Sequence, residues 1–162
     1  MDAIDTEAFE RLSWHDCHIW RLDLHAGTPA EDDWTSDLVL GIDFIVEWLC
    51  GIDGRTRFRV APARLAFHGV TDLQVHIACG DGGPQTALHE LSIDRIERER
   101  VRDQQVFLDL PYYRWRIRLN WPAGGEIAFG AFGFTQTLRA EPVLTEAQQL
   151  TRGQRRRLLG LE

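Results

Sequence analysis

The segment Trp14-His15-Asp16-Cys17-His18 holds the densest group of side chains that could do chemistry. Imidazole, carboxylate and thiolate groups transfer protons and bind zinc. If the segment is a strand, successive side chains point to opposite faces of the sheet and cannot all converge on one ion. A zinc site would need a more distant ligand, for which the candidates are His68, His76 and His89.

Two interpretations of this segment follow. In the first, His15, Asp16 and His18 form a cluster that binds a metal or a small ligand. In the second, which we favour, His15 and Asp16 hydrogen-bond to the backbone where a helix passes into the first strand. We accordingly expect no bound metal and no cofactor.

Carboxylates form a second candidate site, along residues 36–50. The stripe consists of Asp37, Asp43 and Glu47, with Asp23 as a potential neighbour on an adjacent strand. Paired carboxylates can act as general acid and base, hydrolyse glycosides or bind calcium and magnesium. Successive residues on one face of a strand lie ~6.6 Å apart, so Asp37 and Asp43 are too widely spaced to share an ion. Because the stripe lies opposite an apolar one, we expect its acids to face solvent.

Arginines follow the same alternation at Arg114, Arg116 and Arg118. Arginine interleaved with aromatic residues can bind single-stranded nucleic acid. Here the aromatic residues fall on the opposite face of the strand, where they fit a core. We therefore expect outward arginines such as Arg114 and Arg116 to pair with acids across the sheet.

Charge is distributed unevenly along the sequence, whose net formal charge is −7. Residues 1–54 carry 13 acids and two arginines, a net of −11, whereas residues 55–162 carry 16 arginines and 12 acids, a net of +4. Phosphate repels an acidic protein, which argues against nucleic-acid binding. An acidic N-terminal half can instead steer a basic protein towards it.

Several classes of enzyme are excluded by composition. All 18 basic residues are arginine, whereas Walker-type phosphate loops, protein kinases and Schiff-base enzymes need a lysine. The only serines are Ser13, Ser36 and Ser92, and none lies in a GxSxG motif. No glycine-rich dinucleotide motif is present. The sequence favours a protein that is not an enzyme.

The three cysteines, Cys17, Cys50 and Cys79, are odd in number, widely spaced and without a CxxC pair. This pattern argues against a disulfide framework or a zinc ribbon. Because Cys50 and Cys79 each continue an apolar stripe, we expect both to be buried free thiols.

Apolar residues recur with a period of two, which is typical of strands. The clearest stripes run from Leu38 to Cys50 and from Tyr113 to Trp121. A change of parity between Val60 and Leu65 predicts a bulge or break at residues 61–63. Further alternating runs bring the count to about seven strands, separated by turns that contain glycine or proline.

These elements predict a mainly β protein, built as a twisted antiparallel sheet, a sandwich or an open barrel. Short helices are expected at both ends, at residues 5–12 and 145–152, with residues 1–152 forming one domain and 153–162 a mobile tail. No run of ~18 apolar residues is present, and residues 1–12 lack the features of a secretion signal. We therefore expect a cytoplasmic protein without a membrane partner.

Two segments together resemble a known family. Ser13-Trp14-His15-Asp16, followed by Ile19 and Leu22, resembles the S-F-H-D opening of a bacterial immunity-protein family from polymorphic toxin systems, with Trp14 in place of the usual phenylalanine. Residues 65–73, LAFHGVTDL, resemble the later F-x-G-V-x-D-L segment of that family, in the same order. The resemblance covers under a fifth of the chain. It implies a small β-rich protein that binds and neutralises a toxin, with no catalytic residues.

The sequence thus favours a non-enzymatic protein that binds a basic partner through its acidic N-terminal half, at Asp23, Asp37, Asp43 and Glu47. The alternative is a β protein that binds a metal or a small ligand at His15, Asp16 and His18. A third interpretation is a domain whose sheet edge mediates only self-association, which would make it a homo-oligomer.

Overall fold

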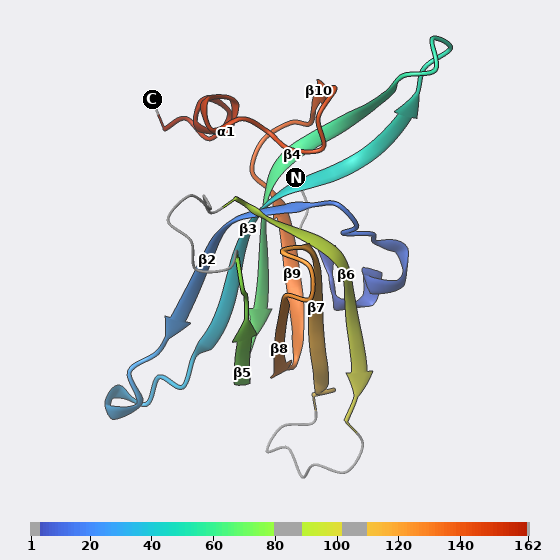
Figure 1. The fold of residues 1–162 in the computed structure, drawn as a ribbon. Coiled ribbons are helices and arrows are strands. Elements are labelled where there is room, and N and C mark those ends of the chain that lie inside the picture. The colour runs from blue at the N-terminus through green and yellow to red at the C-terminus, as the bar shows by residue number, and fades with distance from the viewer. Residues whose placement is uncertain (1–3, 80–88, 102–109, 162) are drawn as a thin grey trace.

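A computed structural model describes residues 4–79, 89–101 and 110–161 of the protein (Figure 1). Ten strands lie within these residues. They are β1 (Ile4–Asp5), β2 (His18–Ala26), β3 (Ser36–Cys50), β4 (Thr56–His68), β5 (Thr71–His76), β6 (Leu91–Arg100), β7 (Tyr113–Trp121), β8 (Glu126–Ala131), β9 (Gly133–Leu138) and β10 (Val143–Thr145). The helical elements are two 3₁₀ helices, η1 (Thr6–Arg11) and η2 (Pro29–Glu31), and one α-helix, α1 (Arg152–Leu158). None of the helices in the described ranges is long and apolar enough to cross a membrane.

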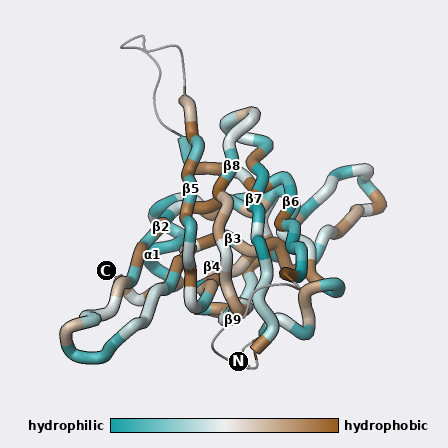
Figure 2. The backbone as a smooth tube through the Cα atoms, turned by 90° about the horizontal axis from the view of Figure 1, so that it is seen from below, coloured by the Kyte–Doolittle hydropathy of each residue, from teal (hydrophilic) through white to brown (hydrophobic). Residues whose placement is uncertain are grey.

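The strands form one open antiparallel sheet in the order β1-β9-β4-β3-β2-β6-β7-β8-β5, with β10 paired to β4. The prediction of a mainly β, antiparallel fold is therefore confirmed. β8 and β9 lie towards opposite ends of this order, yet only Phe132 separates them in the chain. The sheet must therefore bend back on itself without closing, so that the part containing β8 and the part containing β9 are joined at Phe132 (Figure 2).

The inner face of the curled sheet encloses an aromatic core. The rings of Phe9, Trp14, Phe67, Trp115 and Phe134 contact one another, mostly edge to face, which suits their quadrupoles. Trp115 is 2% exposed and donates its indole N–H to the carbonyl of Ala131 at 3.2 Å. The stripe predicted for β7 is buried as far as Leu119, but Trp121, at the end of the strand, is half exposed.

The outer face of β3 is also buried in its centre, which the sequence pattern did not predict. Every residue from Leu38 to Ile45 is buried, including Asp43. The strand has a bulge between Ile45 and Glu47. The bulge reverses the parity of the predicted stripe, so Val46 and Cys50 are exposed.

β4 contains no break at residues 61–63, where one was predicted. It pairs continuously with β3, Val60 opposite Ile45 and Ala63 opposite Ile42. The apolar residues of β4 do change from one face of the strand to the other. No break is needed, because both faces of the sheet are buried there. Val60 and Ala63 lie on opposite faces, and both are almost completely buried.

The C-terminal segment covers this outer face. Residues 153–162, expected to be a mobile tail, include most of α1, whose Arg155 is 6% exposed. The helix predicted at residues 145–152 is wrong. Thr145 ends β10 instead, and the capping box belongs to Thr151 and Gln154 at the start of α1. At the other end of the chain, η1 confirms the predicted helical segment, with Asp5 as its N-cap.

The cysteines differ from the prediction. Cys50 is exposed, Cys79 is half-buried, and Cys17 is the completely buried thiol. The bulge in β3 accounts for Cys50, since it places the end of the stripe on the solvent side. Burial raises the pKa of the Cys17 thiol to about 12, which keeps it protonated and unreactive.

Substituting Trp115→Ala should lower the free energy of unfolding by roughly 3–5 kcal/mol, because it leaves a large cavity in the aromatic core. Trp34→Ala is the matched control, since Trp34 is 73% exposed and surface substitutions usually change stability by less than about 0.5 kcal/mol. Urea denaturation of both variants measures the difference, and equal stabilities would contradict this description of the core.

Thiol labelling of the native protein should modify Cys50 quickly and leave Cys17 unmodified until the protein unfolds. The reason is that a buried thiol with a raised pKa offers neither access nor thiolate. Peptide mapping after timed exposure to an aromatic disulfide reagent distinguishes the sites. Modification of Cys17 at the rate of Cys50 in native protein would refute the assignment.

Candidate functional site

The acidic stripe of β3 does not form one solvent-facing surface. Asp43, expected to be exposed, is completely buried beneath α1. Its carboxylate accepts hydrogen bonds from Arg155 Nε at 3.0 Å, Arg155 Nη2 at 2.6 Å and the backbone N–H of Leu150 at 2.8 Å. The alternating pattern suggested solvent, but the C-terminal segment folds back over this position.

Glu90, whose side chain is 36% exposed, completes this group at its edge. It accepts from Nη1 of Arg155 at 2.9 Å and from Nη2 at 3.0 Å. Burial disfavours the charge on Arg155, but the hydrogen bonds and negative charges of Asp43 and Glu90 outweigh it and raise the pKa of Arg155. The three side chains therefore form a charged clamp between the sheet and the C-terminal segment.

The other acids predicted as a binding surface each have a basic partner. Asp37 lies 3.1 Å from Nδ1 of His68. Asp23 pairs with Arg21 at 2.6 Å, and Glu47 lies 3.8 Å from Arg59. Asp37 and Glu47 therefore pair across strands with residues of β4, Asp23 pairs within β2, and none of the three pairs with the arginines of β7.

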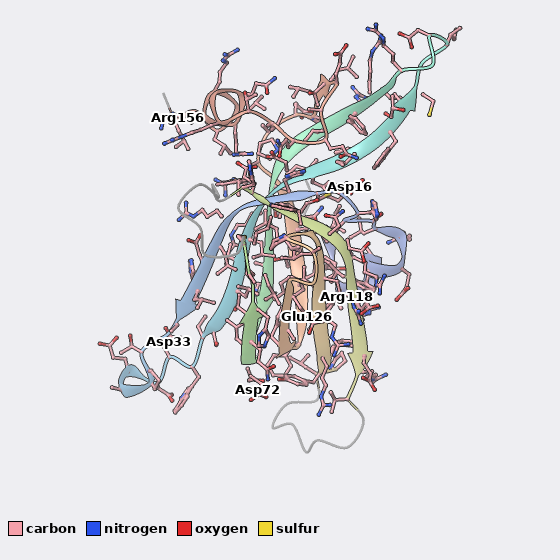
Figure 3. All side chains as sticks on the ribbon, viewed as in Figure 1. Asp16, Asp33, Asp72, Arg118, Glu126 and Arg156 are labelled. Atoms are coloured by element: carbon pink, nitrogen blue, oxygen red, sulfur yellow. The ribbon has the colours of Figure 1, made fainter. Side chains whose placement is uncertain are left out.

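The arginines of β7 pair elsewhere on the sheet. Arg116 contacts Glu126 of β8, and Arg118 contacts Glu97 of β6. Figure 3 shows Arg118 and Glu126 low on the sheet, among the strands of its second half. No ion pair links β7 to the acids of β3 within the described ranges.

The cluster of His15, Asp16 and His18 is divided. Asp16 has a left-handed φ of 61° and accepts hydrogen bonds from Asn120 at 2.7 Å and Gln148 at 2.8 Å, with His15 at 3.1 Å. These contacts tie the start of β2 to β7 and to the C-terminal segment. The role is structural, but the partners are side chains rather than the local backbone that the favoured interpretation expected. In the described part of the chain, no group of three or more potential ligands could hold a metal ion.

His18 faces a separate cavity of about 440 Å³, whose wall also includes His89, Glu90 and Trp121. Burial lowers the pKa of His18, so its ring is neutral at neutral pH. Its Nδ1 atom is buried without a hydrogen-bond partner among the described residues. Of the three residues in the predicted small-ligand cluster, only His18 therefore lines a cavity.

Three successive acids without a basic partner among the described residues lie in the loop between β2 and β3, residues 27–35. Its sequence there includes Glu31, Asp32 and Asp33, followed by Trp34. All four are exposed, and no ion pair involves the three acids among the described residues. We call this segment the acidic loop. In Figure 3 the label on Asp33 marks it, beyond the ends of β2 and β3 and far from Asp16.

The acidic loop is held in one conformation by its own hydrogen bonds. Asp33 accepts from both the backbone N–H and the hydroxyl of Thr35, at 3.0 and 2.6 Å. Gly27 donates to the carbonyl of Thr35 at 2.6 Å, and a Cβ at Gly27 would lie 2.5 Å from the carbonyl oxygen of Asp33. The loop can close this tightly only because residue 27 is glycine.

Trp34 is presented by the same network. Its indole N–H donates to Asp32 at 3.1 Å, and the left-handed φ of 61° at Asp32 sets the direction of the turn. The ring is 73% exposed and has no aromatic contact among the described residues. The hydrogen bonds from Thr35 lower the pKa of Asp33, so the loop stays negatively charged well below neutral pH.

The sequence showed this region only as a polar loop with three successive acids. The signal that could have identified it is an aromatic residue directly after those acids, in a segment whose Pro29 and Gly27 favour a turn. Trp34 lies outside every apolar stripe, so it has no place in the core.

Comparisons with known proteins identify no relative of this chain. No protein-family model, no curated protein and no solved structure matches this chain.

Substituting Asp43→Asn should destabilise the protein by about 3–5 kcal/mol, because it leaves the charge of Arg155 buried without its main partner. Glu47→Gln is the matched control, since its side chain is half exposed and its contact with Arg59 is long; its cost should be at most ~1 kcal/mol. Urea denaturation gives the free energies. Amide exchange over residues 150–159 should accelerate only in Asp43→Asn, and equal effects of the two variants would contradict the clamp.

Proposed function

We propose that this protein is a non-enzymatic, immunity-like binding protein that neutralises a basic partner protein through the acidic loop. The observation that carries the proposal is the exposed Trp34, fixed by Asp32 and surrounded by carboxylates that have no basic partner in the described structure. Tryptophan is the residue type most enriched among the side chains that dominate protein interfaces.

The order of the loop supports this role. A loop already in its bound conformation loses little conformational entropy on binding, so more of the contact energy appears as affinity. Thr35, Gly27 and Asp33 supply that order through their hydrogen bonds. The three carboxylates would attract arginine and lysine side chains around the tryptophan and accelerate encounter with a basic protein.

The resemblance to toxin-immunity proteins supports the same class of partner. In the structure the two resembling segments lie in the framework. Trp14 is buried and donates to Gln136 at 2.7 Å, and Gly69 has a φ of 64° at the turn that follows β4. Under this proposal the shared framework carries a recognition loop of its own, and the encounter with the toxin takes place in the bacterial cytoplasm.

The proposal predicts that charge and aromatic contact contribute separately to binding. The partner is first identified by capture from the native cytoplasm on the immobilised protein, and is then purified and titrated against that protein. Trp34→Ala should weaken binding about 30-fold or more, mainly through faster dissociation. Glu31→Gln with Asp32→Asn should slow association at low salt and leave it almost unchanged at high salt. Asparagine at position 32 keeps both the acceptor for Trp34 and the tolerance of a left-handed φ.

The control is Glu141→Gln with Glu146→Gln, which removes the same charge from exposed acids outside the loop. If this control slows association as much as the loop variant, net charge rather than the loop attracts the partner. If Trp34→Ala binds as tightly as the unmodified protein, the acidic loop is not the interface. The molar mass of the free protein in solution, measured by light scattering, shows whether each variant self-associates.

A further inference from the structure

A second recessed site lies on the outer face of the sheet, away from the acidic loop. It is a cavity of about 350 Å³ between strands β2, β3 and β4 and the residues after α1. The apolar part of its lining, which we call the floor, includes Val39 and Gly41 of β3, and the C-terminal segment contributes Leu159 and Leu161. A cavity of this size holds a small molecule rather than a segment of a protein partner.

Trp20 forms one wall of the cavity. A Cβ at Gly41 would lie 2.8 Å from the Trp20 ring, so the indole rests directly on the glycine backbone. The guanidinium of Arg155 lies 5.0 Å from the centre of this ring, which ties the wall to the buried clamp. The indole Nε1 is buried and has no acceptor among the described residues. The flat apolar surface of the ring suits a ligand with an apolar body.

Arg64 and Arg139 form the opposite side. The backbone N–H of Arg139 donates to Pro62, two residues before Arg64 on β4, so the two arginines are diagonal neighbours on the same face. Neither guanidinium has a hydrogen bond or ion pair with any described residue. By contrast, Arg21, which also lines the cavity, is neutralised by Asp23 at 2.6 Å.

Two neighbouring guanidinium groups without counter-charges repel each other, and an anion between them removes that repulsion. A carboxylate is well matched to them, because each guanidinium can offer it two parallel N–H groups. The buried Asp43 cannot serve, since its oxygens are already bound by Arg155 and Leu150.

We propose that this cavity binds a small organic carboxylate with an aromatic or branched aliphatic body. The apolar body lies on Gly41 and Val39 against the ring of Trp20, and the carboxylate pairs with Arg64 and Arg139. The site is independent of the acidic loop, because it needs neither Trp34 nor the acids around it.

The probe is 3-phenylpropionate, with its neutral amide as the matched compound. Titration is followed by the indole N–H signals in a ¹H–¹⁵N spectrum, with the Trp20 signal assigned by its loss in Trp20→Phe. We expect saturable binding that shifts the Trp20 signal, and at least tenfold weaker binding of the amide. Arg64→Gln and Arg139→Gln should each weaken binding of the carboxylate about tenfold, whereas Arg139→Lys should retain part of it.

Arg114→Gln is the control, because Arg114 is an outward arginine on β7 that also has no hydrogen bond or ion pair with a described residue and lies outside this cavity. Unchanged binding by Arg114→Gln, together with an unchanged unfolding midpoint in all arginine variants, supports the site. No saturation by the probe, equal binding of the amide, or equal weakening by Arg114→Gln would overturn the proposal. Equal binding of inorganic phosphate would also overturn it, since the apolar floor would then play no part.

Discussion

The clamp of Asp43, Arg155 and Glu90 is the interaction on which the arrangement of this protein depends. It joins the middle of β3, the segment before β6 and the C-terminal helix, which are far apart in the sequence. A buried charge is costly unless its hydrogen-bonding positions are filled. Here Asp43 accepts three hydrogen bonds, and the Nη2 group of Arg155 also donates to the carbonyl of Leu150. The clamp therefore permits one position of the C-terminal segment on the sheet.

That position determines what the outer face can do. With α1 fixed over Asp43, Leu159 and Leu161 are brought beside Trp20 and Gly41, and the cavity between them exists only in this arrangement. The same covering allows Val60 and Ile45 to be buried on the outer face while Leu65 and Phe67 are buried on the inner one. The double burial of the sheet and the recessed site thus have a common origin.

Sequence patterns predicted the fold where one face of a strand is buried and missed it where both are. The stripe from Tyr113 to Trp121 has one apolar face, so its period of two identified the core side at Trp115 and Ile117. In β3 the bulge after Ile45 is a shift of register against β4, and the cover over Asp43 depends on Arg155, 112 residues further along the chain. Local alternation contains no information about such contacts.

The C-terminal helix shows the same limit on a smaller scale. Thr145-Glu-Ala-Gln148 and Thr151-Arg-Gly-Gln154 have the same capping-box spacing, and only the second begins a helix. The difference lies in Arg155, whose burial against Asp43 stabilises one turn over the other. In the sequence alone, the run of arginines at residues 155–157 suggests a solvated tail. That Arg155 is the buried one follows only from its contact with Asp43.

The uneven charge of the sequence had two explanations, pairing within the protein and attraction of a basic partner, and the structure shows the first of them for four of the acids. Asp23, Asp37, Asp43 and Glu47 are all paired with basic side chains of the same molecule. These pairs balance the negative charge of the four acids inside the protein. Glu47 and Asp43 do so with arginines of the basic half of the sequence, Arg59 and Arg155. Glu31, Asp32 and Asp33 have no such partner, and their hydrogen bonds serve instead to order the loop that presents Trp34. Three acids without a basic partner among the described residues therefore lie together at the surface beside an exposed aromatic ring, whereas Glu141 and Glu146, which also have no ion pair with a described residue, lie outside this loop.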